Sequence, residues 1–72
     1  MTNTKALREE IEKSGIKYKH IAESLGLSRY GLQRKIENDS EFKAGEIAGI
    51  CSLLGIQADQ RDKIFFYLDC RF

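Results

Sequence analysis

The residues best suited to specific chemistry lie in one short stretch near the middle of the chain. Its polar side chains are Ser28, Arg29, Tyr30, Gln33 and Arg34. Arginine donates two parallel hydrogen bonds to the O6 and N7 atoms of guanine, and glutamine pairs in a similar way with adenine. Gly31 adds no side chain beside them, so a helix carrying these residues can approach another surface closely. The stretch predicts a helix face that contacts the base edges of duplex DNA.

Lysine and tyrosine side chains lie on both sides of this stretch. Lys17, Tyr18 and Lys19 precede it at a predicted helix start, where free backbone N–H groups favour a phosphate. Lys35 and Lys43 follow it. We expect these five residues to contact backbone phosphates, which position a protein on DNA without specifying a sequence. About six such contacts would make the affinity fall steeply with salt.

Two short amphipathic segments, at about 18–25 and 29–37, are expected to position these side chains. Their inward positions recur at helical spacing and are Ile21, Ala22, Leu25, Leu32 and Ile36. Ala22 is small enough for close helix contact, and Gly26 supplies a left-handed turn. Ser28 is a favourable N-cap for the second segment. The pattern predicts a helix-turn-helix over about residues 17–37.

The rest of the sequence predicts three more helices. They are expected at about 4–14, at about 44–54 and from about residue 58 onwards, with Gly15 and Gly55 ending the first two. Within the 44–54 helix, Cys51 is expected as a small core residue, and Gly45 and Gly49 suggest close approach of another backbone. The expected fold is all-α, a compact five-helix bundle with a central helix-turn-helix, formed by residues 1–72 as a single domain.

Composition excludes several classes of protein. The chain has 72 residues, of which 42% are hydrophobic and 32% charged, so a disordered segment is not expected. No apolar run approaches the roughly 20 residues of a membrane span, and the N-terminus lacks a signal-peptide pattern, so we expect a cytoplasmic protein without a membrane partner. Cys51, Cys70 and one histidine do not form a zinc pattern. We expect no enzyme, cofactor or small-molecule ligand, because no catalytic spacing or phosphate loop is present.

The net charge of +1 conceals an uneven distribution. Residues 13–35 contain six basic residues and one acidic residue, a net charge of +5. Residues 37–72 contain seven acidic residues and four basic ones, a net charge of −3. The positive charge therefore coincides with the predicted DNA-contacting segment, as binding to a polyanion requires.

The chain resembles the Cro/repressor class of helix-turn-helix proteins (the XRE-like family), including small prophage regulators of Gram-positive bacteria. The matching residues are Leu7, Ile11, Ile21-Ala22, Leu25-Gly26-Leu27-Ser28, Leu32, Ile36, Phe42, Glu46-Ile47, Ile50 and Leu53-Leu54-Gly55. Tyr18 stands where many members carry Gln, and Lys43 where many carry Ser or Thr. The resemblance implies a lambda-repressor-like five-helix domain, usually a homodimer, that binds a palindromic operator in double-stranded DNA and represses transcription.

Other interpretations of the same residues remain open. Arg29, Gln33 and Arg34 also fit a solvated helix face, and Tyr30 fits packing against Tyr18. The acidic second half allows a helix-turn-helix interaction module, such as an antitoxin, adaptor or antirepressor, that acts through protein partners. A dimerisation segment is expected at about 58–72 because one short helix cannot bury all the apolar residues there. The residues assigned to it are Phe66, Tyr67 and Phe72.

Overall fold

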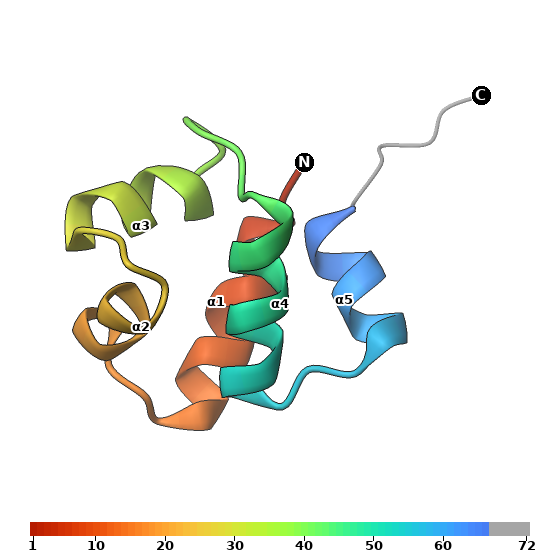
Figure 1. The fold of residues 1–72 in the computed structure, drawn as a ribbon. Coiled ribbons are helices and arrows are strands. Elements are labelled where there is room, and N and C mark those ends of the chain that lie inside the picture. Colours follow the sequence, from red (N-terminus) through yellow and green to blue (C-terminus); the bar gives the residue numbers. More distant parts are fainter. Residues whose placement is uncertain (67–72) are drawn as a thin grey trace.

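Five α-helices and no strand make up residues 1–66, the part of the chain that the structure, a computed structural model, describes (Figure 1). They are α1 (Thr4–Ser14), α2 (Tyr18–Ser24), α3 (Arg29–Ile36), α4 (Ala44–Leu54) and α5 (Ala58–Phe65). The expected all-α class is confirmed, and α2 and α3 each end one residue earlier than predicted. In this part of the chain, no helix combines the length and apolar character needed to cross a membrane.

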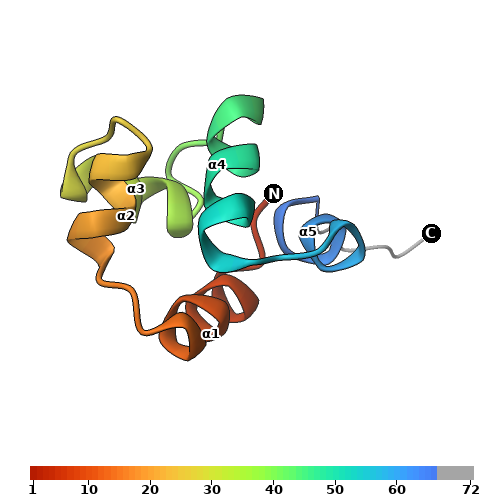
Figure 2. The same ribbon diagram turned by 60° about the horizontal axis from the view of Figure 1, so that its bottom comes forward.

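The helices are arranged on either side of a central pair. Figures 1 and 2 show α2 and α3 side by side at one end, α1 and α4 in the middle, and α5 at the opposite end. Helix α1 contacts α3, α4 and α5, and α2 contacts both α3 and α4. The radius of gyration is 11.5 Å, close to the value of about 11 Å for a compact chain of this length. Helix α1 therefore connects the α2–α3 end to α5.

The core is built from the inward faces of all five helices. Its fully buried large side chains are Leu7, Ile11, Ile21, Leu32, Ile36 and Ile50. Phe42 closes one side of the core, with its ring centre 5.3 Å from that of Phe65 in an edge-to-face arrangement. Cys51 is buried as expected; burial raises the pKa of its thiol, although the charge of Arg61 opposes this shift. Cys70 lies outside the described residues.

Close packing between α2 and α4 explains one of the two glycines inside α4. A Cβ atom at Gly49 would lie 2.9 Å from Cδ2 of Leu25, whereas a Cβ atom at Gly45 would meet no atom within 4 Å. The close approach of another backbone suggested for these glycines is therefore not found: a side chain lies close to Gly49, and no atom lies close to Gly45. The missing side chain at Gly49 lets the end of α2 lie against α4.

Left-handed residues end both helices of the α2–α3 unit. Gly26 (φ 71°) follows α2, and the N–H of Leu27 donates to the carbonyl of Ala22 at 2.9 Å, which is a Schellman ending. Asn38 (φ 67°) has the same role after α3, where the N–H of Asp39 donates to the carbonyl of Arg34 at 2.8 Å. Asparagine is the usual alternative to glycine at this position. The chain thus turns sharply at both ends of α3.

The Asn38 side chain also ties the N-terminal segment to the end of α3. Its Oδ1 accepts from the N–H of Thr2 and its Nδ2 donates to the carbonyl of Thr2, both at 2.8 Å. The Thr4 hydroxyl donates to the carbonyl of Ile36 at 2.6 Å, and the Asn3 N–H donates to the carbonyl of Ile64 at 2.6 Å. These bonds hold the N-terminal residues between α3 and α5.

Candidate nucleic-acid interface

The exposed side of α3 carries two rows of side chains. Arg29 and Gln33 form one row, and Tyr30 and Arg34 form the other, because residues four apart share a helix face. All four are exposed, and Tyr30 is 72% exposed. The guanidinium carbon of Arg34 lies 6.0 Å from the centre of the Tyr30 ring, so Tyr30 is beside Arg34. Leu32, which is fully buried, holds the opposite side of α3 against the core.

One of these rows borders a cavity between α1, α2 and α3. The cavity has a volume of about 270 Å³ and is lined by Arg8, Tyr18, Arg29, Gln33 and Ile36. Two arginines, one tyrosine and one glutamine therefore border a common space. All four groups can donate hydrogen bonds to an anionic oxygen.

Ser28 acts as the N-cap of α3, as its sequence position predicted. Its Oγ accepts from the N–H of Gly31 at 2.9 Å. A hydroxyl that accepts one hydrogen bond still has its own proton to donate. The capping role therefore leaves Ser28 able to donate to a base or a phosphate. A side chain at Gly31 would crowd this cap, since a Cβ atom there would lie 3.1 Å from Ser28 Oγ.

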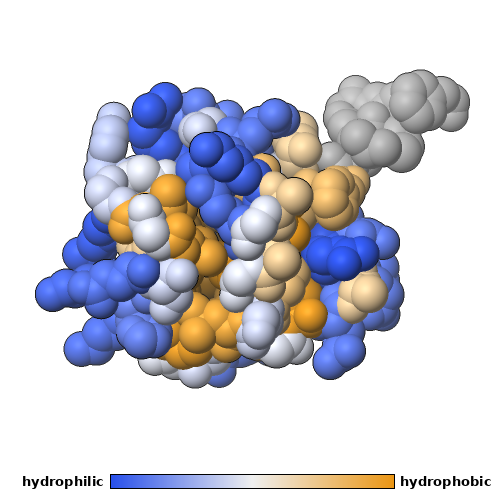
Figure 3. Space-filling view, in the orientation of Figure 1, coloured by the Kyte–Doolittle hydropathy of each residue, from blue (hydrophilic) through white to orange (hydrophobic). Residues whose placement is uncertain are grey.

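The residues at the start of α2 differ in exposure. Lys17 and Lys19 are exposed, and Tyr18 between them is half-buried and packs against the core. Figure 3 shows hydrophilic side chains projecting around the α2–α3 end of the molecule, with apolar atoms visible between this end and α4. Two of the predicted phosphate-binding residues thus lie on the same end of the molecule as the exposed rows of α3.

Lys35 does not lie where the sequence analysis placed it. It was expected to contact a phosphate, but it is buried, with 8% of its surface exposed. Its Nζ donates to Oε1 of Glu46 at 2.6 Å and to the carbonyl of Glu41 at 3.2 Å. Because its charge is neutralised inside the protein, we remove Lys35 from the set of phosphate-binding residues. Its role is to join the end of α3 to the start of α4.

Glu46 connects Lys35 to the first turn of α4. Its Oε1 also accepts from the N–H of Lys43 at 2.8 Å, which caps the helix because a lysine side chain has no acceptor of its own. Burial alone would raise the pKa of Glu46. The hydrogen bonds from Lys35 and Lys43 and the charges of both lysines outweigh burial, so this pKa lies below its ordinary value. The carboxylate is therefore held in its charged form.

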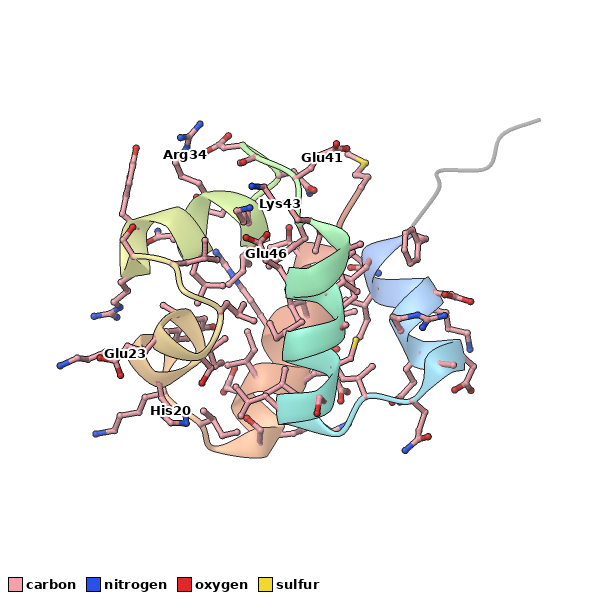
Figure 4. All side chains as sticks on the ribbon, in the orientation of Figure 1. His20, Glu23, Arg34, Glu41, Lys43 and Glu46 are labelled. Carbon is pink, nitrogen blue, oxygen red and sulfur yellow. The ribbon has the colours of Figure 1, made fainter. Side chains whose placement is uncertain are left out.

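The Lys43 side chain is exposed at the start of α4. Figure 4 shows Lys43 and Glu46 at this helix start, near the end of α3 from which Arg34 projects. The same view shows His20 and Glu23 on α2, directed away from α4. Lys43 is thus on the surface, as a phosphate-binding residue requires, but on the α4 side of α3.

Of the predicted dimerisation segment, the structure describes residues 58–66. Phe66 follows α5 and is 56% exposed, and it borders two shallow cavities with Met1, Ala44 and Ala48 among their lining residues. Phe65 is buried beside Phe42. Tyr67 and Phe72, the other two residues assigned to the interface, lie outside the described residues.

The structure adds a pair of residues that the sequence analysis did not select. Arg8 on α1 donates from Nη2 to Oε2 of Glu37 at 3.0 Å, across 29 positions of sequence. Oε2 of Glu37 also accepts from Nε2 of Gln33 at 3.5 Å. No periodicity or motif in the sequence connects positions so far apart, so this pair becomes visible only in three dimensions.

Comparison with known proteins gives no match: no family model, curated protein or solved structure is similar to this chain. The exposed surface of α3 and the residues around it therefore indicate what this protein can bind.

Proposed function

We propose that this protein is a sequence-specific DNA-binding regulator of transcription, of the Cro-like helix-turn-helix type. In this proposal α2 and α3 form the helix-turn-helix, and α3 lies in the major groove of double-stranded DNA. Arg29, Tyr30, Gln33 and Arg34 contact bases, and Ser28 contacts a base or a phosphate at the tip of α3. The proposal includes no catalytic step and no cofactor.

The observation that carries the proposal is the division of α3 into a buried side and an exposed side. The exposed side presents residue types that hydrogen-bond to base edges, in two rows one helical turn long. The buried side fixes the helix against the core. Lys17 and Lys19 project from the neighbouring start of α2, as expected of residues that contact backbone phosphates.

A homodimer on a palindromic operator is part of the proposal. Two copies related by twofold symmetry would place two α3 helices in successive major grooves, about one helical turn of DNA apart. The exposed Phe66 at the end of α5 supports a contact between copies at that end. The operator should then have two inverted half-sites.

Selection of bound duplexes from a random pool tests the function directly. We expect an inverted repeat with half-site centres about 10 base pairs apart. Enrichment of a single, non-repeated site would contradict the dimer and preserve DNA binding. Absence of salt-sensitive binding to any duplex would contradict the proposed function.

The second candidate function is an interaction module that acts through protein partners. The observation that favours it is the apolar surface around Met1 and Phe66, which are 66% and 56% exposed. Under this alternative, a protein partner covers that surface and α3 remains free. The absence of duplex binding in the selection would favour this function.

Replacing Arg34 with Ala should relax sequence specificity at one base pair. The side chain is exposed, and it meets the protein through a hydrogen bond of 3.4 Å to the Asp39 carbonyl and lies beside the exposed Tyr30 ring, so the fold should persist. Loss of a bidentate contact to guanine is expected to weaken operator binding by about 1–3 kcal/mol. The measurement is the dissociation constant for the operator and for all single-base variants. Equal loss on every variant would contradict a base contact.

Replacing Lys19 with Ala should instead weaken binding to all duplexes alike. Lys19 is exposed at the start of α2, where we expect it to contact one phosphate. The slope of log affinity against log salt concentration should become less steep by about 0.9. Unchanged salt dependence would show that Lys19 contacts no phosphate.

A further inference from the structure

The cavity between α1 and the α2–α3 unit is bordered by a cationic residue that is not among the proposed DNA contacts. Arg8 on α1 lines it together with Tyr18, Arg29 and Gln33. A water molecule takes up about 30 Å³, so a volume of about 270 Å³ has room for one phosphate group. The Arg29–Gln33 row forms one wall, so the cavity adjoins the face proposed to enter the major groove.

In the free protein Arg8 forms an ion pair with Glu37. The Arg8 guanidinium donates to Oε2 of Glu37 at 3.0 Å, and the same oxygen accepts from Gln33 Nε2 at 3.5 Å. The two charged side chains of the pair are 48% and 40% exposed, so water screens their attraction. Glu37 thus presents one anionic oxygen to two of the groups that line the cavity, through contacts weak enough to be exchanged.

We propose that Arg8 is a further phosphate-binding residue for duplex DNA, and that Glu37 is an intramolecular competitor for it. This inference rests on the proposed function and extends the DNA-binding surface from α2–α3 to α1. A carboxylate and a phosphate offer guanidinium the same kind of acceptor, so a backbone phosphate entering the cavity replaces the Glu37 carboxylate on Arg8. Displacing Glu37 opposes binding equally for all sequences, so the pair lowers the affinity for operator and non-operator DNA alike.

The first test concerns Arg8 and uses the full-length protein with a duplex of unrelated sequence. Affinity is measured over a range of salt concentrations for the wild type, Arg8→Ala and Arg8→Lys. Arg8→Ala should make the salt slope less steep by about 0.9, and Arg8→Lys should retain the wild-type slope because the charge remains. An unchanged slope for Arg8→Ala would overturn the inference.

The second test concerns the competitor and uses Glu37→Gln, which keeps the shape of the side chain. Exposed ion pairs are weak, so its removal should tighten binding to any duplex by up to about fivefold. The matched control is Glu9→Gln, which removes an equal charge from an exposed position next to Arg8. The gain in affinity from Glu37→Gln should exceed the gain from Glu9→Gln. This difference should disappear when Arg8→Ala is also present.

The outcomes separate the two levels of the argument. Equal effects of Glu37→Gln and Glu9→Gln, or an undiminished effect of Glu37→Gln beside Arg8→Ala, would overturn the competitor role while leaving DNA binding intact. A wild-type protein that binds no duplex would overturn the proposed function, and this inference with it. Circular dichroism of each variant confirms that the helices are retained.

Discussion

Replacing Leu32 with Ala is expected to reduce the free energy of unfolding by about 2–5 kcal/mol. Leu32 is fully buried and anchors the middle of α3 in the core. The substitution removes apolar contacts and leaves a cavity that the surrounding helices fill only in part. A domain of this size has a total stability of only about 4–11 kcal/mol, so the variant should be partly unfolded on mild heating. Urea and thermal denaturation followed by circular dichroism measure the loss.

Tyr30→Ala is the matched control for Leu32→Ala. Tyr30 lies on the same helix and its side chain is larger, but it is 72% exposed. Its loss should change stability by no more than about 0.5 kcal/mol. If the two variants were equally stable, α3 would not be anchored through Leu32. The order should reverse for DNA affinity at low temperature. There Leu32→Ala is still folded and should bind DNA, whereas Tyr30→Ala has lost a proposed base contact and should bind more weakly.

Replacing Glu46 with Ala is expected to have the second largest effect, a loss of about 3 kcal/mol. Glu46 and Lys35 are largely buried, with 14% and 10% of their side chains exposed. Removing the carboxylate leaves the Lys35 ammonium with the carbonyl of Glu41 and without a counter-charge. It also removes the cap on the Lys43 N–H at the start of α4. Chemical denaturation at neutral pH measures the loss, which should be smaller for Glu46→Gln because an amide oxygen still accepts hydrogen bonds.

The difference in stability between the wild type and Glu46→Gln should also depend on pH. The pKa of Glu46 in the folded protein lies below its ordinary value of 4.5. A carboxyl group with a lowered pKa in the folded state stabilises the protein fully above the unfolded pKa, and this contribution is lost as pH falls through the folded pKa. The wild type should therefore exceed Glu46→Gln in stability at neutral pH and approach it below about pH 4.5. A gap that is constant from pH 7 to pH 3 would contradict the ion pair.

Local sequence signals predicted the helices well because helix boundaries depend on neighbouring residues. Gly26 supplies the positive φ that ends α2, and Ser28 supplies the cap that begins α3. The spacing of Leu32 and Ile36 then assigns one side of α3 to the core. The residues that remain, Arg29, Tyr30, Gln33 and Arg34, must then lie on the exposed side, so the sequence was sufficient to identify this surface.

The tertiary structure alone decided the burial and the partners of several charged and polar groups. Lys35 appeared to be a surface cation, yet the chain after α3 folds back and buries it against Glu46. Arg8 and Glu37 are separated by 29 positions, and Thr2 and Asn38 by 36. Charge and hydrogen-bonding capacity are visible in a sequence, whereas the partner of each group depends on which helices meet. The sequence thus determined the helices and the exposed rows of α3 that we propose contact bases. The packing of α1, α3 and α4 decided which positive charges remain on the surface.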